Sequence, residues 1–301
     1  MLPLLIALWI AAPVSAPASP TLRLETTAFG QSAEIEILAA PGPPETSQSL
    51  RPVLHAAVAA LAEVEHLTNP ARPESAVAAL NAAAGQGPQA VPPSLLPVLA
   101  KALDFCLWTE GAHGPLSRGS CDGLAVDSRN RRVALAAESG IDLWSFADGA
   151  AIDRAVEVLK QRGVTSGVVR VGGTWRAFGP GPQGKGWTVV LPVFQGTAES
   201  AGRIPLRDQA LSIADPAAGR PFLNQRTGQP VQGVVATVAV TEIAADARPL
   251  AVSLLITGPR EGQLRIGSLR PRPSALWLLG NGSGAPLRVF YRWTELTRPP
   301  R

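Results

Sequence analysis

Hydrophobic positions follow two different periods along the chain, which predicts a mixture of helices and strands. A pattern from Leu22 to Leu38, broken by Gly30, ends in an alternation of apolar and charged residues from Ala33 to Ile37, as expected of a half-buried strand or a hairpin. Between residues 53 and 67 apolar side chains recur every three or four positions, which predicts a long helix entered at Ser47 or Ser49. Further helices are predicted at residues 74–83, 94–109, 147–162 and 246–255.

The remaining apolar runs are short and predict strands. They cover residues 132–135, 168–171, 187–193, 234–240 and 274–279. Helices and strands do not alternate strictly, so we expect an α+β fold, a single domain of mixed, largely antiparallel sheet with packed helices. Residues 111–140 are expected to be mostly loop. Neither a repeat nor a linker divides the chain, so the domain is expected to span residues 21–301.

The first 18 residues differ from the rest. An apolar run from Leu2 to Ala12 is followed by Ala16-Pro17-Ala18, a small-x-small sequence typical of signal-peptidase sites. This pattern predicts a signal peptide and export to the periplasm or cell envelope. No basic residue precedes Arg23, so an uncleaved anchor remains the alternative, and membrane contact is then expected through this segment alone. The run is shorter than the roughly 20 residues that a membrane span needs.

Composition narrows the class of protein. The 301 residues are 46% hydrophobic and 17% charged, which suits a folded domain with a sizeable core. The net charge of +4 is modest, and the arginines near the end lack interleaved aromatics, so no nucleic-acid partner is expected. Cys106 and Cys121 are the two cysteines. In an oxidising compartment they either form a disulfide or remain a buried thiol and a loop thiol.

Two common kinds of catalytic motif are excluded. Residues 179–186 have the Gly and Lys spacing of a P-loop, but Gly186 replaces the magnesium-binding Ser or Thr and two prolines remove N–H donors. A hairpin loop is predicted there instead. No G-x-S-x-G elbow is present. His55, His66 and His113 stand apart in the sequence, and we expect structural roles for them.

Several short segments follow one another in a characteristic order. They are Phe29-Gly30-Gln31, Ser75 to Asn81, Val91 to Leu96, Thr109 to His113, Ile141 to Asp153, Val171-Gly172-Gly173, Arg226 to Pro230 and Ala245-Asp246-Ala247. Together they resemble the motifs of the FAD:protein FMN transferase family, the ApbE type of exported flavin transferase. The resemblance covers nearly the whole chain after the predicted signal peptide.

The resemblance implies a reaction and a site. The family breaks the pyrophosphate of FAD and attaches FMN through a phosphoester to a Thr or Ser hydroxyl of an acceptor protein, with magnesium offsetting the phosphate charge. FAD and an acceptor protein are therefore the implied partners. The implied cofactor-binding residues are Gly172, Gly173, Asp153, Thr227 and Gly228, and the implied metal ligand is Asp246.

The chain departs from the family pattern at positions that carry chemistry. The departures are Asp148 in place of Lys, Pro221 and Asn224 in place of His and Asp, Leu250 in place of a metal-binding Thr, and Gly114 and Leu116 in place of Asp and Thr. Loss of one phosphoryl-stabilising group typically costs about 100-fold in rate or more. Transfer is therefore expected to be weak or absent, no catalytic residue is assigned, and magnesium loses one of its ligands.

Each retained residue also has a purely structural interpretation. Asp246 and Asp148 suit helix N-caps, Asp153 a solvated helix face, Gly172-Gly173 a tight turn, and Thr227-Gly228 a type II turn. Two functions follow. The first is an exported flavin transferase-like protein with little activity. The second is a pseudoenzyme that serves as a flavin-binding or protein-interaction module of the cell envelope, and a purely structural envelope protein is a third, less favoured idea.

Overall fold

The computed structural model describes residues 19–39, 44–195, 197, 200–218, 222–280 and 285–293. The predicted signal peptide and Pro221 lie outside the described residues. No helix of the described residues is long and apolar enough to cross a membrane.

An eight-stranded sheet forms the centre of the fold, and every neighbouring pair of its strands is antiparallel. In spatial order the strands are β1 (Thr21–Ala28), β2 (Gln31–Leu38), β8 (Gly167–Val171), β9 (Thr174–Phe178), β12 (Ala210–Ala214), β15 (Val234–Thr241), β16 (Ser274–Leu279) and β17 (Leu287–Tyr291). The predicted alternation in β2 is confirmed, because Ala33, Ile35 and Ile37 are fully buried. The antiparallel α+β prediction is confirmed with it.

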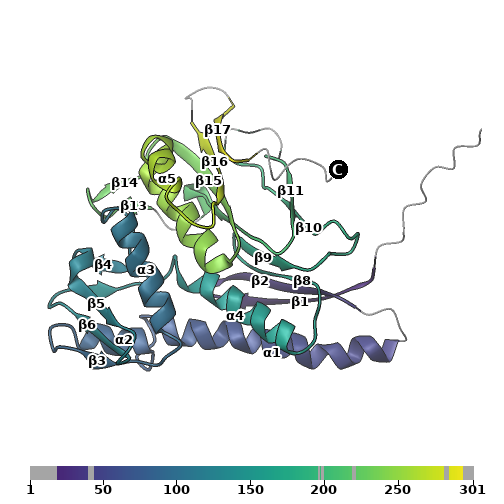
Figure 1. The fold of residues 1–301 in the computed structure, drawn as a ribbon, viewed down its shortest axis with the longest axis horizontal. Coiled ribbons are helices and arrows are strands. Elements are labelled where there is room, and N and C mark those ends of the chain that lie inside the picture. Colours follow the sequence, from purple (N-terminus) through teal and green to yellow (C-terminus); the bar gives the residue numbers. More distant parts are fainter. Residues whose placement is uncertain are drawn as a thin grey trace, which may run out of the picture.

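Helices cover one face of this sheet (Figure 1). Helices α4 (Ala147–Gln161) and α5 (Ala244–Ile266) pack directly on its strands, and α1 (Pro44–Thr68) packs on α4 and β1. Helices α2 (Ala76–Ala82) and α3 (Leu96–Trp108) lie to one side, where α2 packs on α1 and α3 on α5. Helix α1 begins before the predicted entry at Ser47 or Ser49. Helix α5 passes the predicted end at Leu255, but its backbone breaks at Gly258, where φ is 69°. Two helical segments therefore follow one another in α5, and the first lies against β12 and β15.

The opposite face is covered by a separate ribbon of β10 (Trp187–Val190) and β11 (Arg203–Leu206). Trp187 and Ile204 pack there with Leu211 and Val238 of the large sheet. The segment 179–186 connects β9 to β10, and these strands belong to different sheets. The prediction of a hairpin loop was therefore wrong, because β10 pairs with the strand that follows it.

Small strands occupy the region expected to be mostly loop. They are β4 (Leu116–Arg118), β5 (Leu124–Asp127), β6 (Arg132–Leu135) and β7 (Gly140–Ile141), and β3 (Gln89–Ala90), from an earlier part of the chain, pairs with β6. Only β6 was predicted, because strands of two to four residues are too short to show a period. A disulfide between Cys106 of α3 and Cys121 of η1 (Cys121–Gly123) ties this region to α3, and this decides between the two alternatives left open for the cysteines.

Candidate functional site

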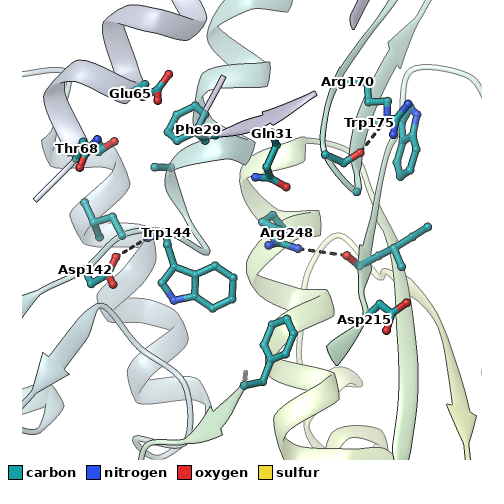
Figure 2. A pocket seen from close by; sticks show the side chains of 18 of the residues that line it. Phe29, Gln31, Glu65, Thr68, Asp142, Trp144, Arg170, Trp175, Asp215 and Arg248 are labelled. Atoms are coloured by element: carbon teal, nitrogen blue, oxygen red, sulfur yellow. Dashed lines mark hydrogen bonds between the residues drawn. The ribbon is translucent and has the colours of Figure 1, made fainter. Parts of the chain in front are cut away.

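A cavity of about 1160 Å³ opens where the turns of β1–β2 and β8–β9 meet α1 and the first segment of α5 (Figure 2). Its volume slightly exceeds the range of roughly 300–1,000 Å³ typical of small-molecule sites. Aromatic side chains make up much of its wall, namely Phe29, Trp144, Trp175 and Phe222. The cavity can therefore hold a ligand of cofactor size with ring faces to stack on.

The Gly172-Gly173 turn forms part of this wall. It joins β8 to β9, with Val171 opposite Thr174, and Gly172 has a φ of 53°. A Cβ atom at Gly172 would overlap the side chain of Gln31, which lines the same cavity. Gly172 and Gly173 were interpreted either as cofactor-binding residues or as a tight turn. The two interpretations are compatible, because the tight turn brings bare backbone to the cavity.

Two arginines lie over aromatic rings of the wall, and the sequence analysis named neither. The guanidinium carbon of Arg170 is 5.1 Å from the ring centroid of Trp175, and its Nε donates to the Gly172 carbonyl at 2.8 Å. The guanidinium carbon of Arg248 is 5.3 Å from the Trp144 ring centroid, and its Nη1 donates to the Ile213 carbonyl at 3.2 Å. Guanidinium groups held on rings suit an anionic, aromatic ligand.

Asp148 lies behind Arg248 rather than in the cavity wall. It is 1% exposed, in the first turn of α4, and its Oδ2 is 3.2 Å from Arg248 Nε. This contact is an ion pair without a hydrogen bond, because Nε has no hydrogen-bond partner. Burial raises the pKa of Asp148, and the charge of Arg248 opposes that shift. Asp148 is also not the predicted N-cap, since Phe146 holds that position.

The contact between α4 and α5 explains two more residues of the motif around Asp148. A Cβ atom at Gly149 would overlap the Ala244 carbonyl oxygen, so glycine allows the helices to approach. The carboxylate of Asp153 accepts hydrogen bonds from the N–H groups of Ala244 and Ala245, both at 2.9 Å, and pairs with Arg176. Burial raises the pKa of Asp153, and Arg176 opposes this. Asp153 therefore holds the start of α5 and lies outside the cavity lining.

Asp246, the implied metal ligand, is paired with a lysine. Its Oδ1 lies 2.6 Å from Lys101 Nζ on α3. It is the third residue of α5, whose N-cap is Ile243, so the N-cap prediction was wrong. Leu250 is 1% exposed and offers no oxygen. Magnesium prefers about six oxygen ligands, and the described residues contain no group of three His, Cys, Asp or Glu able to hold a metal. The residues present therefore do not fit magnesium.

Thr227 and Gly228 lie on the hairpin of β13 (Leu223–Asn224) and β14 (Gln229–Pro230), away from the large cavity. Thr227 borders a separate hollow of about 220 Å³. Asn224 Oδ1 accepts from the N–H groups of Arg226 and Thr227, and Gly228, with a φ of 71°, donates to the Asn224 carbonyl at 2.7 Å. Four residues separate the paired strand ends, so the predicted type II turn is instead a longer loop closed by the Asn224 side chain.

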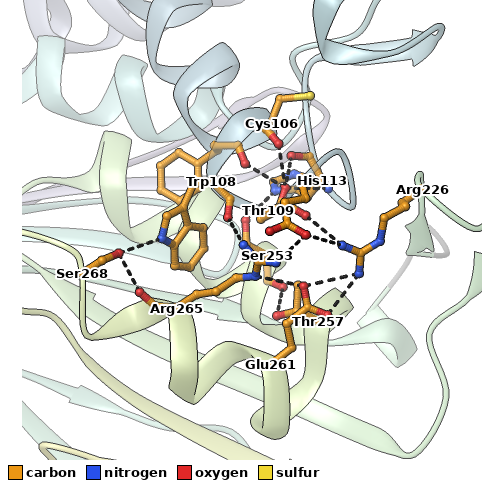
Figure 3. Close-up of polar contacts among 12 residues, drawn as sticks. Cys106, Trp108, Thr109, His113, Arg226, Ser253, Thr257, Glu261, Arg265 and Ser268 are labelled. Atoms are coloured by element: carbon orange, nitrogen blue, oxygen red, sulfur yellow. Dashed lines mark hydrogen bonds and ion pairs between the residues drawn. The ribbon is translucent and has the colours of Figure 1, made fainter.

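His113 is buried in a polar cluster beside α5 (Figure 3). Its Nδ1 and Nε2 are each 2.8 Å from a hydroxyl, those of Ser253 and Ser145, and its ring stacks on Phe146. Burial, reinforced by the charge of Arg248, lowers the pKa of His113 to about 3. The ring therefore stays neutral near pH 7 and is closed off from any ligand, which agrees with the structural role expected for it.

Comparisons with known proteins agree on one family. A model described as the ApbE family matches residues 29–119 and 116–276. Among solved structures, the flavin transferase ApbE from Vibrio cholerae is 18% identical, with a TM-score of 0.79 over 93% of this chain and 100% of its own. The apo flavinyl transferase ApbE from Pseudomonas stutzeri is 19% identical, with a TM-score of 0.79 over 93% and 97%.

The ApbE protein from Thermotoga maritima is similar to the same degree, at 19% identity and a TM-score of 0.79 over 93% of this chain and 100% of its own. At these identities the structures establish a shared fold. No curated protein sequence matches the chain.

Proposed function

The chain belongs to the ApbE family, and from this premise we propose that it is an exported protein that binds FAD and retains little or no transfer of FMN to an acceptor protein. FAD is expected to occupy the cavity in Figure 2. The alternative is a flavin-binding or protein-interaction module with no transfer at all.

One observation carries the binding half of the proposal. Bare backbone at Gly172-Gly173 and the guanidinium groups of Arg170 and Arg248 line one cavity together with the ring of Trp144. Phosphate oxygens accept from N–H groups and guanidinium groups, and a flavin or adenine ring stacks on an aromatic face. A dinucleotide that contains both a diphosphate and flat rings matches this set.

The low activity follows from what the site lacks. Transfer breaks the phosphoanhydride bond of FAD, forms a phosphoester to a hydroxyl and releases AMP, and the hydroxyl proton needs a base. His113 is buried and neutral, Asn224 is an amide in a turn, and Asp246 is paired with Lys101. Carboxylates of Glu65, Asp142 and Asp215 line the cavity, but among the described residues they do not converge into a metal-binding group.

The export half of the proposal rests on residues 1–18 and on the disulfide. Disulfides form and persist in oxidising compartments such as the periplasm and are rare in the cytosol. The Cys106–Cys121 bond is therefore in keeping with a cleaved signal peptide.

A titration of the purified protein with FAD, together with chromatography of released AMP, tests the proposal. We expect one FAD per chain, with Trp144→Ala weakening binding about tenfold through the lost stacking face and Thr227→Ala leaving it unchanged. AMP release is expected to be at least about 100-fold slower than in a variant that combines Asp148→Lys, Arg248→Leu, Pro221→His, Asn224→Asp and Leu250→Thr with added magnesium. Failure to bind FAD would refute the function, and rapid AMP release by the unmodified chain would refute the loss of activity.

A further inference from the structure

Two cations of the chain itself occupy places where the family motif implies other positive groups. Arg248 lies beside Asp148, the position of the family lysine, and Lys101 lies beside Asp246, the position of the implied metal ligand. Both replacements join residues far apart in the sequence. Each brings a positive group from a neighbouring helix to a carboxylate.

Arg248 is placed to meet a ligand. Its side chain projects from α5 into the cavity between Trp144 and Asp215 (Figure 2). It is only 8% exposed, its Nη1 donates to the Ile213 carbonyl, and its Nε is buried against Asp148, so a ligand in the cavity can meet only the terminal nitrogens of the guanidinium. A guanidinium has five N–H donors and binds phosphate in a bidentate manner. The ion pair with Asp148 and the ring of Trp144 hold it in position before a ligand arrives.

Charges in the cavity are divided between its two sides. Arg170 and Arg248 lie with Asp215 on the side of the Gly172-Gly173 turn, whereas Glu65 and Asp142 lie across the cavity (Figure 2), so the first side carries two cations and one carboxylate. An anionic diphosphate is attracted to the first side. Carboxylates on the other side accept hydrogen bonds from the hydroxyl and ring N–H groups of a nucleotide or flavin. The division therefore orients a dinucleotide without a metal.

The charge of Asp246, the implied metal ligand, is already balanced by a lysine. Lys101 Nζ lies 2.6 Å from Asp246 Oδ1, and the two side chains are 35% and 28% exposed. Leu250 presents a buried methyl surface where the motif has a hydroxyl. A single carboxylate with a lysine on it is a poor site for a cation that needs several oxygens.

We propose that this chain binds the diphosphate of its ligand without a divalent cation, with Arg248 and Arg170 as the phosphate-binding groups, while Lys101 and Asp246 form a pair outside the cavity lining that takes no part in binding. The proposal deepens the proposed function, and rests on it for the identity of the ligand as FAD. ADP carries a diphosphate as well, so the proposal predicts that ADP also binds without a metal.

Calorimetric titrations of the full chain with FAD, ADP and riboflavin, each in EDTA and in excess magnesium, test the proposal. We expect the Kd for FAD and for ADP to differ by less than about twofold between the two buffers. In the charge-balanced variant Asp148→Asn/Arg248→Gln, the Kd for FAD and for ADP is expected to rise at least about tenfold, because charge-assisted hydrogen bonds to the phosphates are lost. Riboflavin, which has no phosphate, should keep its affinity.

Two further variants serve as controls. Lys101→Met/Asp246→Asn removes the implied metal position and is expected to leave ADP affinity unchanged in EDTA. The exchange Asp148→Lys/Arg248→Leu keeps a cation on α4 but removes the Arg248 guanidinium from the cavity, so it should also weaken ADP binding at least about tenfold. Circular dichroism verifies folding, and if the charge-balanced variant does not fold, the exchange variant decides, because an unchanged ADP affinity in EDTA without the Arg248 guanidinium would contradict the proposal.

The outcomes separate this proposal from the proposed function. A tenfold or greater gain in affinity for FAD or ADP with magnesium would overturn metal-free binding while leaving the flavin site intact. Binding of ADP in EDTA without binding of FAD would refute the flavin function and support the inference. Binding of none of the three ligands would overturn both.

Discussion

Helix α5 has two segments that differ in what their charges do. Before the break at Gly258, Arg248 forms a buried pair with Asp148 at the cavity, and Ser253 contacts the buried His113. After the break, Glu261 and Arg265 form a more exposed network with Arg226 and Glu110. Figure 3 shows Arg226, Glu261 and Arg265 of this network. Arg226 lies 3.1 Å from Glu261, and Arg265 lies 2.9 Å from Glu110.

The two segments also differ in how they relate to the family motifs. Arg226, which matches the family, fastens its hairpin to the second segment of α5, where it touches protein and not the cavity. Of the departures, Leu250 lies within the first segment and Asp148 contacts it through Arg248, and both are buried outside the cavity lining. Arg226 thus agrees with the family motif at a structural contact, whereas Asp148 and Leu250 differ from the motif. Family membership and transfer activity are therefore separate questions for this chain.

The largest effect is expected from the buried pair. Arg248→Met leaves Asp148 as an unpaired buried charge, which should lower the free energy of unfolding by about 3–5 kcal/mol. The double variant Asp148→Leu/Arg248→Met should recover most of that loss, because an apolar pair of similar volume needs no compensation. Urea unfolding measures both. Equal losses in the single and double variants would show that packing, not the unpaired charge, dominates this segment.

An intermediate and pH-dependent effect is expected at His113. Burial lowers its folded pKa to about 3 from the usual 6.5, so below pH 6.5 the unfolded chain binds a proton that the native state refuses. The free energy of unfolding should therefore fall as the pH drops from 6.5 towards 3, by up to about 1.4 kcal/mol per pH unit from this group.

The variant His113→Phe/Ser145→Ala/Ser253→Ala replaces the cluster with apolar groups of similar shape. Urea unfolding at several pH values between 4 and 7 should show a shallower slope in this variant. A slope equal to that of the parent protein would mean that His113 is protonated in the native state.

The smallest effect is expected after the break. Arg226→Gln removes two partly exposed ion pairs, and such pairs are worth about 0–1 kcal/mol each. The loss should shrink further in high salt, since exposed charges are screened. Glu261→Gln removes the ion-pair partner of Arg226, and it should cause a similarly small and salt-sensitive loss in the free energy of unfolding. If the free energy of unfolding fell by more than about 2 kcal/mol regardless of salt, this network would contribute as much as a buried ion pair. The two segments of α5 would then not differ in what their charges do.

Sequence patterns predicted the elements that have a clear period. Helices α3 and α4 were found because their apolar residues recur at helical spacing. Strand β12 was missed because all five of its residues, Ala210 to Ala214, are buried and show no alternation. The second segment of α5 was missed because Gly258 and Pro259 look like a helix end, yet a helical turn resumes after them.

The site was predicted in part. Gly172 and Gly173 line the cavity, and their turn could be found because a turn with bare backbone is a local feature, whereas their binding of a cofactor stays a prediction. Arg248 was missed because its position next to Asp148 depends on how closely α4 and α5 pack at Gly149, and no local pattern contains that contact. Asp148 itself could have indicated such a partner, because a carboxylate on a buried helix face requires a cation from elsewhere in the chain.

The central claim is that Arg248, and not a metal ion at Asp246, meets the diphosphate of the ligand. A crystal structure of the protein with FAD and manganese, with anomalous scattering recorded for the metal, tests it most directly. The account predicts phosphate oxygens about 3 Å from the Arg248 guanidinium and no anomalous peak at Asp246, where Lys101 remains paired. Manganese bound between Asp246 and the diphosphate, with Lys101 displaced, would contradict it.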